Sequence, residues 1–439
     1  MSFNCCKTSS EIKFMFSYPT VKCIYHLYNV YLINIYTQQY LRVIRMSSHF
    51  DIIIIGGGVN GASIAMALSQ RSGANIGLFD RGGLGSGATG RSGAMIREHY
   101  LNSELVRMAS DAKKFFEDWQ ANRDYDLKFR KTGRVLLFDQ SDADAAIKNA
   151  EMNKSEGVNI EVLDKKTTSE ILGEVCLDDI EVILYEPDAG YADSLRTTYA
   201  FAKEAQKNGT TIHTHTSVER ILTKSDRVCG IDTSVGKFEA EKIINVSGPW
   251  VNKLLSPLGE SLPVTPIRVQ MVGLRRPPHM EHLEQIVVDH TSGAYFRTDG
   301  TPFTLVGGES EEDLREIVDP DSFGLNADHD FITRYWSRAI NRFPSFKDAT
   351  CRGGYGSLYD MTPDSNPILD KSSKIEGLYN VTGFSGHGFK LSPVIGEMVA
   401  DMVMGTNHSR HDNNIFRESR FANGSGITAK YPYLKRAHQ

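Results

Sequence analysis

The sequence predicts an α/β fold into which a second, strand-rich α+β part is inserted. Residues 51–80 have the pattern of a strand, a glycine turn, a helix and a strand, the unit from which parallel sheets are built. A similar strand, glycine turn and helix return at 377–404. Between them, 211–246 and 266–306 contain short strand patterns separated by turn residues. Segments of the α/β part therefore lie before and after the strand-rich part in the sequence, as expected when one domain is inserted into another.

The first glycine turn has the spacing of a dinucleotide site. Ile52 to Ile55 is a β-branched apolar run typical of a buried parallel strand, and the residues that follow fit G-x-G-x-x-G. In this motif the glycines allow a tight turn, approach of a pyrophosphate and close helix packing, while the helix N-terminus faces the phosphates. A carboxylate about twenty residues later takes the ribose hydroxyls. The candidate cofactor-binding residues here are Gly56, Gly58, Val59, Gly61 and Asp80.

The loop after this unit favours a flavin. A nicotinamide-binding unit usually continues into another helix, whereas residues 82–93 contain six glycines among small polar residues. Such a loop offers many backbone N–H groups to a ligand, so we predict FAD, although a flexible surface loop would have the same composition. The candidate ligands are Arg81, Thr89, Gly90, Arg91 and Ser92.

Two later turns are candidates for the same site. Gly248 joins an apolar strand to a helix predicted from Pro249, although an ordinary strand-to-helix connection fits equally well. A second glycine turn precedes a helix predicted over 391–404, and a helix N-terminus suits developing negative charge, such as that at the N1/O2 edge of a reduced flavin. The further cofactor-binding candidates are Val218, Gly248, Gly383, Gly386, Gly388 and Lys390.

Composition excludes several classes of protein. A chain of 439 residues exceeds one usual core, so two domains are expected. The net charge of −5 argues against nucleic-acid binding, and no uninterrupted apolar stretch is long enough to predict a transmembrane segment. None of the six cysteines has C-x-x-C spacing, so we predict no metal site and expect reduced thiols in a cytoplasmic protein.

The two ends of the chain differ from its body. Residues 1–45 carry six tyrosines, five basic residues and one acid. They fit a targeting peptide, which would allow a mitochondrial-matrix location, a membrane-surface tether, or sequence upstream of a functional start at Met46, which we favour. Residues 406–439 are polar, and we predict a loosely held C-terminal tail.

Hydrophobic periodicity predicts the remaining elements. Apolar residues at three- and four-residue steps predict an amphipathic helix from Leu101 to Trp119. Turns are predicted at 184–190 and 359–364. Other helices are predicted over 142–155, 193–207 and 328–343, and other strands over 133–138, 211–222, 228–233, 242–246, 266–274, 285–289, 294–297, 303–306 and 377–382.

These segments together resemble the FAD-dependent amine and amino-acid oxidoreductases of the D-amino-acid-oxidase family, with the strongest likeness to sarcosine oxidases, especially the β subunit of the heterotetrameric enzyme. The likeness covers about 47–405 in the same order. It rests on 56–61, 90–97, 359–368 and 383–390 with Pro393 and Gly396-Glu397.

The resemblance implies a Rossmann-like FAD-binding domain with an inserted mixed or antiparallel-sheet substrate domain that covers the flavin. We assign 47–132, 192–264 and 351–405 to the FAD-binding domain and 133–191 and 265–350 to the substrate domain.

The resemblance also implies a reaction. A hydride would leave the carbon next to an amine for flavin N5, and the imine formed would hydrolyse. A fixed substrate carboxylate would hold the donor C–H over the ring, and Arg97 and Lys390 match the family positions that clasp it. His387 would hydrogen-bond the flavin or relay a proton. Tyr295 and Arg297 lie where the family often places substrate-facing residues, and neither is given a role.

Two departures from the family affect the expected chemistry. Ser357 stands where monomeric sarcosine oxidases carry the cysteine that tethers FAD, so we predict noncovalent FAD. The lysine with which those oxidases activate oxygen is not evident, so oxygen, a quinone, a flavoprotein or a partner subunit all remain candidate electron acceptors.

The expected substrate is a small amino acid, most simply a secondary one such as sarcosine or proline. Oxidation of a D-amino acid, glycine or a 2-hydroxy acid on the same fold is an alternative. So is a flavin-bound electron-relay subunit without a substrate of its own.

Overall fold

The computed structural model describes residues 48–280 and 282–434. The expected N-terminal extension and the proposed start at Met46 lie outside this range. The chain divides into two compact units, 1–49 and 50–439, and the elements below belong to the second unit apart from the first residue of β1 (His49–Ile55).

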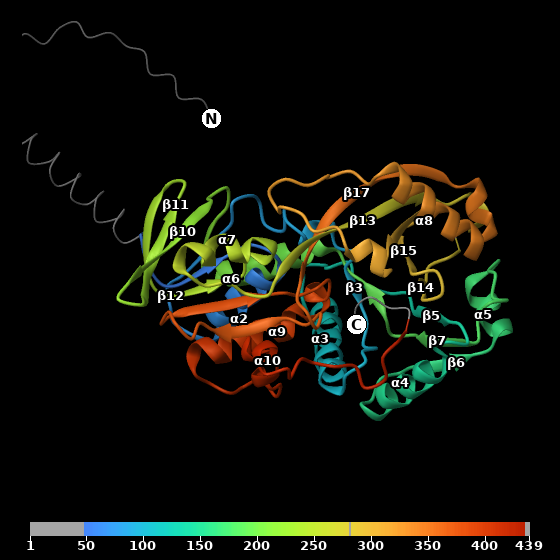
Figure 1. The fold of residues 1–439 in the computed structure, drawn as a ribbon, viewed down its shortest axis with the longest axis horizontal. Coiled ribbons are helices and arrows are strands. Elements are labelled where there is room, and N and C mark those ends of the chain that lie inside the picture. The colour runs from blue at the N-terminus through green and yellow to red at the C-terminus, as the bar shows by residue number, and fades with distance from the viewer. Residues whose placement is uncertain (1–47, 281, 435–439) are drawn as a thin grey trace, which may run out of the picture. The chain divides into compact units, whose positions relative to one another are not determined.

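The first sheet combines strands from distant parts of the chain (Figure 1). Its central order is β10-β11-β12-β1-β2-β9, and β19 pairs with both β12 and β18. The pairs β1–β2, β2–β9 and β12–β19 are parallel. The strands besides β1 are β2 (Ile76–Phe79), β9 (Thr211–His213), β10 (Val218–Lys224), β11 (Arg227–Thr233), β12 (Gly236–Asn245), β18 (Ile368–Lys371) and β19 (Leu378–Thr382).

The apolar run of β1 is explained by burial on both faces of this sheet. Ile52 and Ile54 belong to a core that includes residues of the helices α2 (Val59–Arg71), α3 (Ser103–Asn122), α6 (Ser194–Lys207) and α9 (Gly388–Met404). Ile53 and Ile55 belong to a second core on the other face, with β10 to β12 and α7 (Val251–Leu255). Because alternate side chains of a strand point to opposite faces, a strand buried on both sides must be apolar throughout.

The second sheet has the order β17-β13-β16-β15-β14-β5-β7-β6. It is mixed, since β14 and β5 are parallel while its other pairs are antiparallel. Helix α8 (His329–Arg342) contributes Phe331, Tyr335 and Ala339 to the core beneath it. The strands are β5 (Arg134–Phe138), β6 (Glu161–Leu163), β7 (Val182–Glu186), β13 (Thr265–Arg275), β14 (Ile286–Asp289), β15 (Ala294–Asp299), β16 (Phe303–Gly308) and β17 (Thr350–Met361).

A third, small sheet connects the two parts. It has the order β3-β8-β4, formed by Met95–Ile96, Gly190–Tyr191 and Arg130–Lys131. It fixes the chain immediately before Arg97. The remaining helices are α4 (Ala143–Ser155), α5 (Lys165–Leu172) and α10 (Ser419–Ala422), with 3₁₀ turns at Thr89–Arg91, Gly248–Trp250, Ser256–Leu258, Pro278–Met280, Glu311–Leu314, Pro344–Asp348 and Asn413–Phe416.

The mixed α/β fold class is confirmed, and the predicted long helices are present. Asp193 caps α6 as its sequence position indicates, because its side chain accepts a hydrogen bond from the Arg196 N–H. Within the described residues, no helix is both long and apolar enough to cross a membrane.

Three sequence expectations are wrong in whole or in part. Residues 359–361 close strand β17 and 184–186 belong to β7, because both segments pair with neighbouring strands that the local sequence does not reveal, so the predicted turns are confined to 363–364 and 187–188. The C-terminal segment is not loosely held, since Phe416, Ile427 and Tyr433 are buried. Strand β17 joins the second sheet, and we therefore propose to end the inserted part near Met361.

Candidate active site

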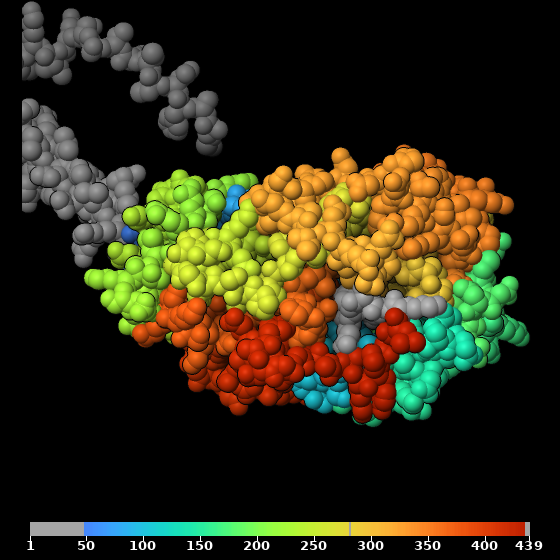
Figure 2. Space-filling model, in the orientation of Figure 1, coloured from blue at the N-terminus to red at the C-terminus, as the bar shows by residue number. Residues whose placement is uncertain are grey.

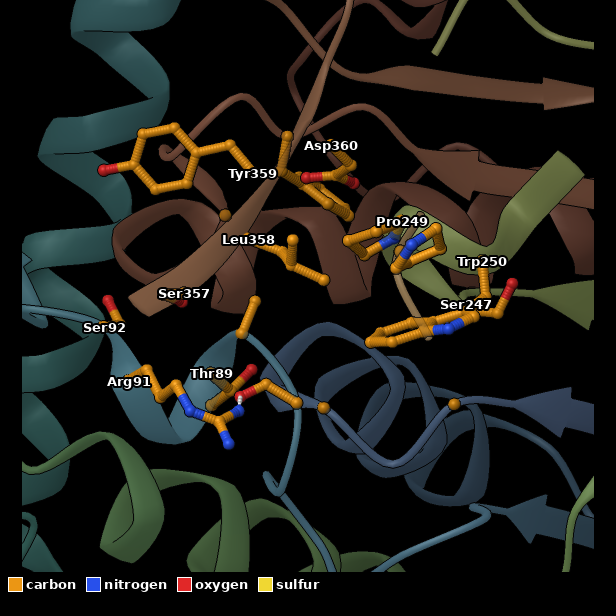
Figure 3. Close-up of a pocket in the computed structure, with 18 of the residues that line it drawn as sticks. Thr89, Arg91, Ser92, Ser247, Pro249, Trp250, Ser357, Leu358, Tyr359 and Asp360 are labelled. Atoms are coloured by element: carbon orange, nitrogen blue, oxygen red, sulfur yellow. Dashed lines mark hydrogen bonds between the residues drawn. The ribbon is translucent and has the colours of Figure 1, made fainter. Parts of the chain in front are cut away.

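A cavity of about 590 Å³ opens between the two sheets. It is lined by the turns after β1 and β12, the loop after β2, strands β13 and β17, and the turn before α9. Figure 3 shows Thr89 and Arg91 on one side of this cavity and Leu358, Tyr359 and Asp360 on the other. A ligand in the cavity would therefore contact both parts of the fold.

The glycine turn has one position that packing within the protein does not explain. A Cβ at Gly56, where φ is +114°, would lie 2.3 Å from the Val246 carbonyl oxygen, and one at Gly61 would lie 1.9 Å from the Gly56 oxygen. Gly58 has an ordinary extended conformation, and only Thr89 Oγ1, at 3.2 Å, would approach its Cβ. The absence of a side chain at Gly58 keeps the cavity open beside the N-terminus of α2, where a phosphate would fit.

Asp80 links the glycine turn to the loop that follows it. Its Oδ2 accepts a hydrogen bond of 2.7 Å from the Gly57 N–H, and its Oδ1 accepts one of 2.7 Å from the Gly82 N–H. Thr89 adds a second link, because its Oγ1 accepts from the Val59 N–H at 3.2 Å. Each carboxylate oxygen keeps a further lone pair, so Asp80 is able to accept from ribose hydroxyls as well.

Most of the predicted cofactor residues line the cavity, and two do not. A Cβ at Gly90 would lie 2.6 Å from the Gly85 oxygen, and one at Gly383 would lie 2.3 Å from Thr362 Cγ2, so contacts within the protein require both glycines. The predicted residues that line the cavity are Gly56, Gly58, Val59, Gly61, Asp80, Arg81, Thr89, Arg91, Ser92, Val218, Gly248, Gly386, Gly388 and Lys390.

A charged cluster closes one end of the cavity. The Arg81 guanidinium lies 4.0 Å from the centroid of the Trp250 ring, and its Nη1 is 2.6 Å from Asp321 Oδ1. Asp321 also accepts a hydrogen bond of 2.7 Å from Trp250 Nε1 and pairs with Lys253. Burial opposes ionisation of Asp321, but hydrogen bonds from Lys253, Arg81 and Trp250 bring its pKa to about 2. Sequence reasoning missed Trp250 and Asp321 because more than seventy positions separate them.

The three predicted catalytic residues converge on the ring of Tyr100, which sequence reasoning missed. The Arg97 guanidinium carbon lies 4.1 Å from the ring centroid, and Lys390 Nζ lies 5.9 Å from it. The Tyr100 hydroxyl is hydrogen-bonded to His387 Nδ1 at 3.1 Å. All four side chains are buried, and only Lys390 lines the cavity. The one local signal that would have suggested Tyr100 is its position in the sequence, three residues after Arg97.

The end of the cavity near Lys390 is formed by the second sheet. Tyr295 donates a hydrogen bond of 2.8 Å to Met271 Sδ, and burial raises the pKa of its hydroxyl well above the usual value. Ser357 lines the cavity and is buried. Arg297 does not line it, because its Nε donates to the Gly93 carbonyl at 2.7 Å and its guanidinium lies over Tyr191. Arg297 therefore holds the glycine-rich loop.

A buried carboxyl joins β17 to the turn before α9. Asp360 Oδ2 accepts a hydrogen bond of 2.7 Å from the Gly383 N–H. Burial raises the pKa of Asp360, while the surrounding N–H groups act in the opposite direction. The contact fixes the spacing between the second sheet and the turn that presents Lys390 to the cavity.

The fold and the cavity define a dinucleotide-binding protein with an inserted substrate part. The family model described as FAD dependent oxidoreductase (DAO) matches residues 51–402, and the chain belongs to this family of FAD-dependent flavoproteins. It is therefore an FAD-dependent oxidoreductase, as the sequence indicated. The open space at Gly58 fits this cofactor. The glycine-rich loop offers fewer N–H groups than the sequence suggested, because those of Gly85, Gly90 and Ser92, among others, donate within the protein.

Known relatives resemble the chain over most of its length. FAD-dependent oxidoreductase domain-containing protein 1 of Mus musculus is 27% identical over 421 residues, 86% of each chain. Monomeric sarcosine oxidase of Bacillus sp. (strain NS-129) is 26% identical, over 86% of this chain and 98% of its own. The crystal structure of L-proline dehydrogenase from P. horikoshii shares the fold, with a TM-score of 0.78 and 24% identity over 86% of this chain and 99% of its own.

Proposed function

We propose that this protein oxidises a small carboxylate-bearing amine, most simply a secondary amino acid such as sarcosine or proline. The observation that carries the proposal is the buried Lys390 cation at the cavity wall, with Arg97 on the same tyrosine ring. Bound FAD would supply the hydride acceptor. The chain's own residues would bind the substrate carboxylate and so orient the donor carbon.

Electrostatics support a carboxylate at this position. Lys390 and Arg97 place two positive charges near one buried ring, and burial makes charge expensive unless it is compensated. The face of Tyr100 offsets part of this cost, because its quadrupole attracts cations. Because Lys390 lines the cavity, a substrate carboxylate bound there would lie beside a positive charge.

We assign different roles to the two cations. Lys390 lines the cavity and would form the direct ion pair. The Nη1 of Arg97 donates to the His99 carbonyl, and its guanidinium covers Tyr100. Arg97 would therefore keep this contact and reach the carboxylate through its remaining N–H groups, since a guanidinium has five N–H donors.

Relatives support an amino-acid substrate and leave its identity open. Monomeric sarcosine oxidase, sarcosine oxidase subunit beta of Arthrobacter sp and glycine oxidase of Geobacillus kaustophilus resemble this chain at 25–27% identity. Glycine or a D-amino acid is thus the second candidate substrate.

We propose oxygen, a quinone or another flavoprotein as electron acceptor. Electron transfer to a partner subunit would require that this protein associates with such a subunit. We propose a cytoplasmic location, or the mitochondrial matrix if residues 1–45 act as a targeting peptide.

Anaerobic mixing with a panel of amino acids tests the proposal. The FAD-loaded protein is mixed with N-methyl, cyclic, D- and unsubstituted amino acids, and bleaching of the flavin absorbance is recorded. Bleaching by an N-methyl or cyclic amino acid is expected. Bleaching by glycine or a D-amino acid alone would identify that compound as the substrate in place of a secondary amino acid. No bleaching by any compound would favour an electron-relay subunit.

Substitution of the two cations tests their assignment. Arg97→Met and Lys390→Met are expected to retain FAD and to lose most turnover, because the substrate is no longer oriented. Each removed charge contact corresponds to about a tenfold to hundredfold effect. Arg123→Met, at the exposed position directly after α3, and Lys148→Met, at an exposed position of α4, are matched controls. Unchanged saturation kinetics in Arg97→Met would remove this residue from the site.

A further inference from the structure

The C-terminal segment 406–434, here called the C-terminal strap, crosses the surface close to the carboxylate end of the site. Figure 2 shows it in red against the blue-green surface of α3 and α4. It ends in Tyr433, whose ring is buried among aromatic side chains.

The strap contacts the five-residue segment that carries Arg97 and Tyr100 at two points. The Lys430 N–H donates a hydrogen bond of 2.8 Å to the Leu101 carbonyl. The Tyr433 hydroxyl is hydrogen-bonded to His99 Nε2 at 3.0 Å, and the two rings lie nearly parallel, at 18° and 6.3 Å between centroids. The strap therefore holds this segment both by its backbone and by a side chain.

His99 transmits this contact to the predicted substrate site. Its carbonyl accepts the hydrogen bond from Arg97 Nη1, and its N–H donates to Glu186 Oε1 at 2.9 Å. Glu186 is itself fixed by a buried ion pair of 2.8 Å with Arg134. The imidazole of His99 thus meets the strap, while its backbone holds both Arg97 and the second sheet.

The strap is anchored firmly enough to impose a position. Arg420 Nε lies 2.8 Å from Asp364 Oδ2, and His411 lies between Glu104 and Asp111, 3.0 Å from each. Near its end, the Leu434 N–H donates to Asp142 Oδ1 at 2.7 Å. Along the chain, Tyr433 therefore lies between the Arg420 ion pair and the Leu434 hydrogen bond, which contact different parts of the fold.

We propose that Tyr433 is a positioning residue for the substrate carboxylate, acting through His99 on Arg97 and Tyr100. This inference rests on the proposed function of the site. Binding of a carboxylate is tighter when the groups that contact it are already ordered, because less conformational entropy is lost on binding. By holding 97–101 in place, the C-terminal strap would order Arg97 and Tyr100 before the carboxylate binds.

The test compares carboxylate binding in matched variants of the FAD-loaded full chain. Acetate is titrated, and its dissociation constant is read from the change in flavin absorbance. Tyr433→Phe keeps the ring and removes one hydrogen bond, so we expect about three- to tenfold weaker acetate binding with FAD retained. Tyr431→Phe is the control in the same strap, since the Tyr431 ring lies near Lys148 and Lys430. Equal acetate binding in Tyr433→Phe and the wild type would overturn the proposal.

Two further measurements separate the possible failures. If Arg97→Met and Lys390→Met both leave acetate binding unchanged, the proposed carboxylate site itself is wrong. If Arg97→Met weakens binding and Tyr433→Phe does not, only the role of the strap is refuted. Hydrogen exchange of the unmodified protein needs no variant. Acetate is expected to slow exchange in peptides covering 97–105 and 426–434 together, and protection of the first peptide alone would contradict the coupling.

Discussion

Tyr100 is the residue around which the predicted catalytic side chains are arranged. Its ring lies beside Arg97 and Lys390, and its hydroxyl contacts His387. Its backbone is fixed by Asn153 of α4, whose Nδ2 donates to the Tyr100 carbonyl at 2.9 Å. The Tyr100 ring thus sets the spacing of the Arg97 and Lys390 cations, whereas its hydroxyl connects the ring to the His387 imidazole.

Substitutions of Tyr100 separate the two contributions. Tyr100→Leu removes the aromatic face, and we expect KM for the amino-acid substrate to rise about tenfold, the equivalent of one cation–π contact at a buried site. Tyr100→Phe keeps the face, so KM should change little while the pH profile of turnover shifts. Tyr199→Phe, at an exposed position of α6, is the control. Equal KM values for Tyr100→Leu and the wild type would contradict this role.

Ser357 predicts how FAD is held. The side chain lines the cavity, and a serine hydroxyl does not form the thioether that a cysteine would form with FAD. Acid precipitation of the FAD-loaded protein is therefore expected to leave a colourless pellet and a yellow supernatant. Yellow colour that stays with the precipitated protein would show a covalent link through another residue.

At the level of elements, helix α3 holds the strap through charge. A hydrogen bond from His411 lowers the pKa of Glu104 to about 2, against the opposing effect of burial, with a further contribution from Arg107. Because the pKa in the folded state lies below that of the unfolded chain, the ionised carboxylate stabilises the fold above a pH of about 4.5, and this stabilisation is lost as the pH falls toward 2.

Denaturation at several pH values tests this contribution. The free energy of unfolding of the wild type and of Glu104→Gln is measured in urea between pH 2 and pH 7. The wild type is expected to be more stable near neutral pH, and the difference should shrink below a pH of about 4.5. Taking the difference between the two proteins removes the contribution of other carboxylates. A difference that does not change with pH would exclude Glu104 as its source.

At the level of the whole molecule, the cavity lies between two sheets, and the core around β1 also includes Leu136 and Leu184 of the second sheet. A ligand that binds only the folded state stabilises it, by about 2.7 kcal/mol at a hundredfold excess over Kd. FAD is therefore expected to raise Tm by several degrees in calorimetry of the flavin-free protein, and to do so in proportion to the logarithm of its concentration. NAD at the same concentrations is the control, and an equal rise with NAD would argue against a flavin-specific cavity.

Local patterns carried the prediction of the first unit and of the helices. A buried strand, a glycine turn and an amphipathic helix each leave a periodic signal within a short window, so the positions of β1, α2, α3, α6 and α8 follow from the sequence pattern. The first residues of the turns expected at 184–190 and 359–364 are strand for the complementary reason. Their strand character comes from pairing with β5 and β13, which lie elsewhere in the chain.

The sequence by itself determined the fold class and the FAD family, because both depend on residue types and on spacing within short segments, whereas Arg97 and Lys390 were predicted as site residues only through the family resemblance. Only the tertiary structure decided that Arg97 stacks on Tyr100 outside the cavity lining and that Lys390 lines it. It also decided that a polar C-terminal segment packs against His99. The contacts of Lys390 with Tyr100 and of Tyr433 with His99 join residues hundreds of positions apart, and such pairs form only when burial of apolar surface brings their elements together.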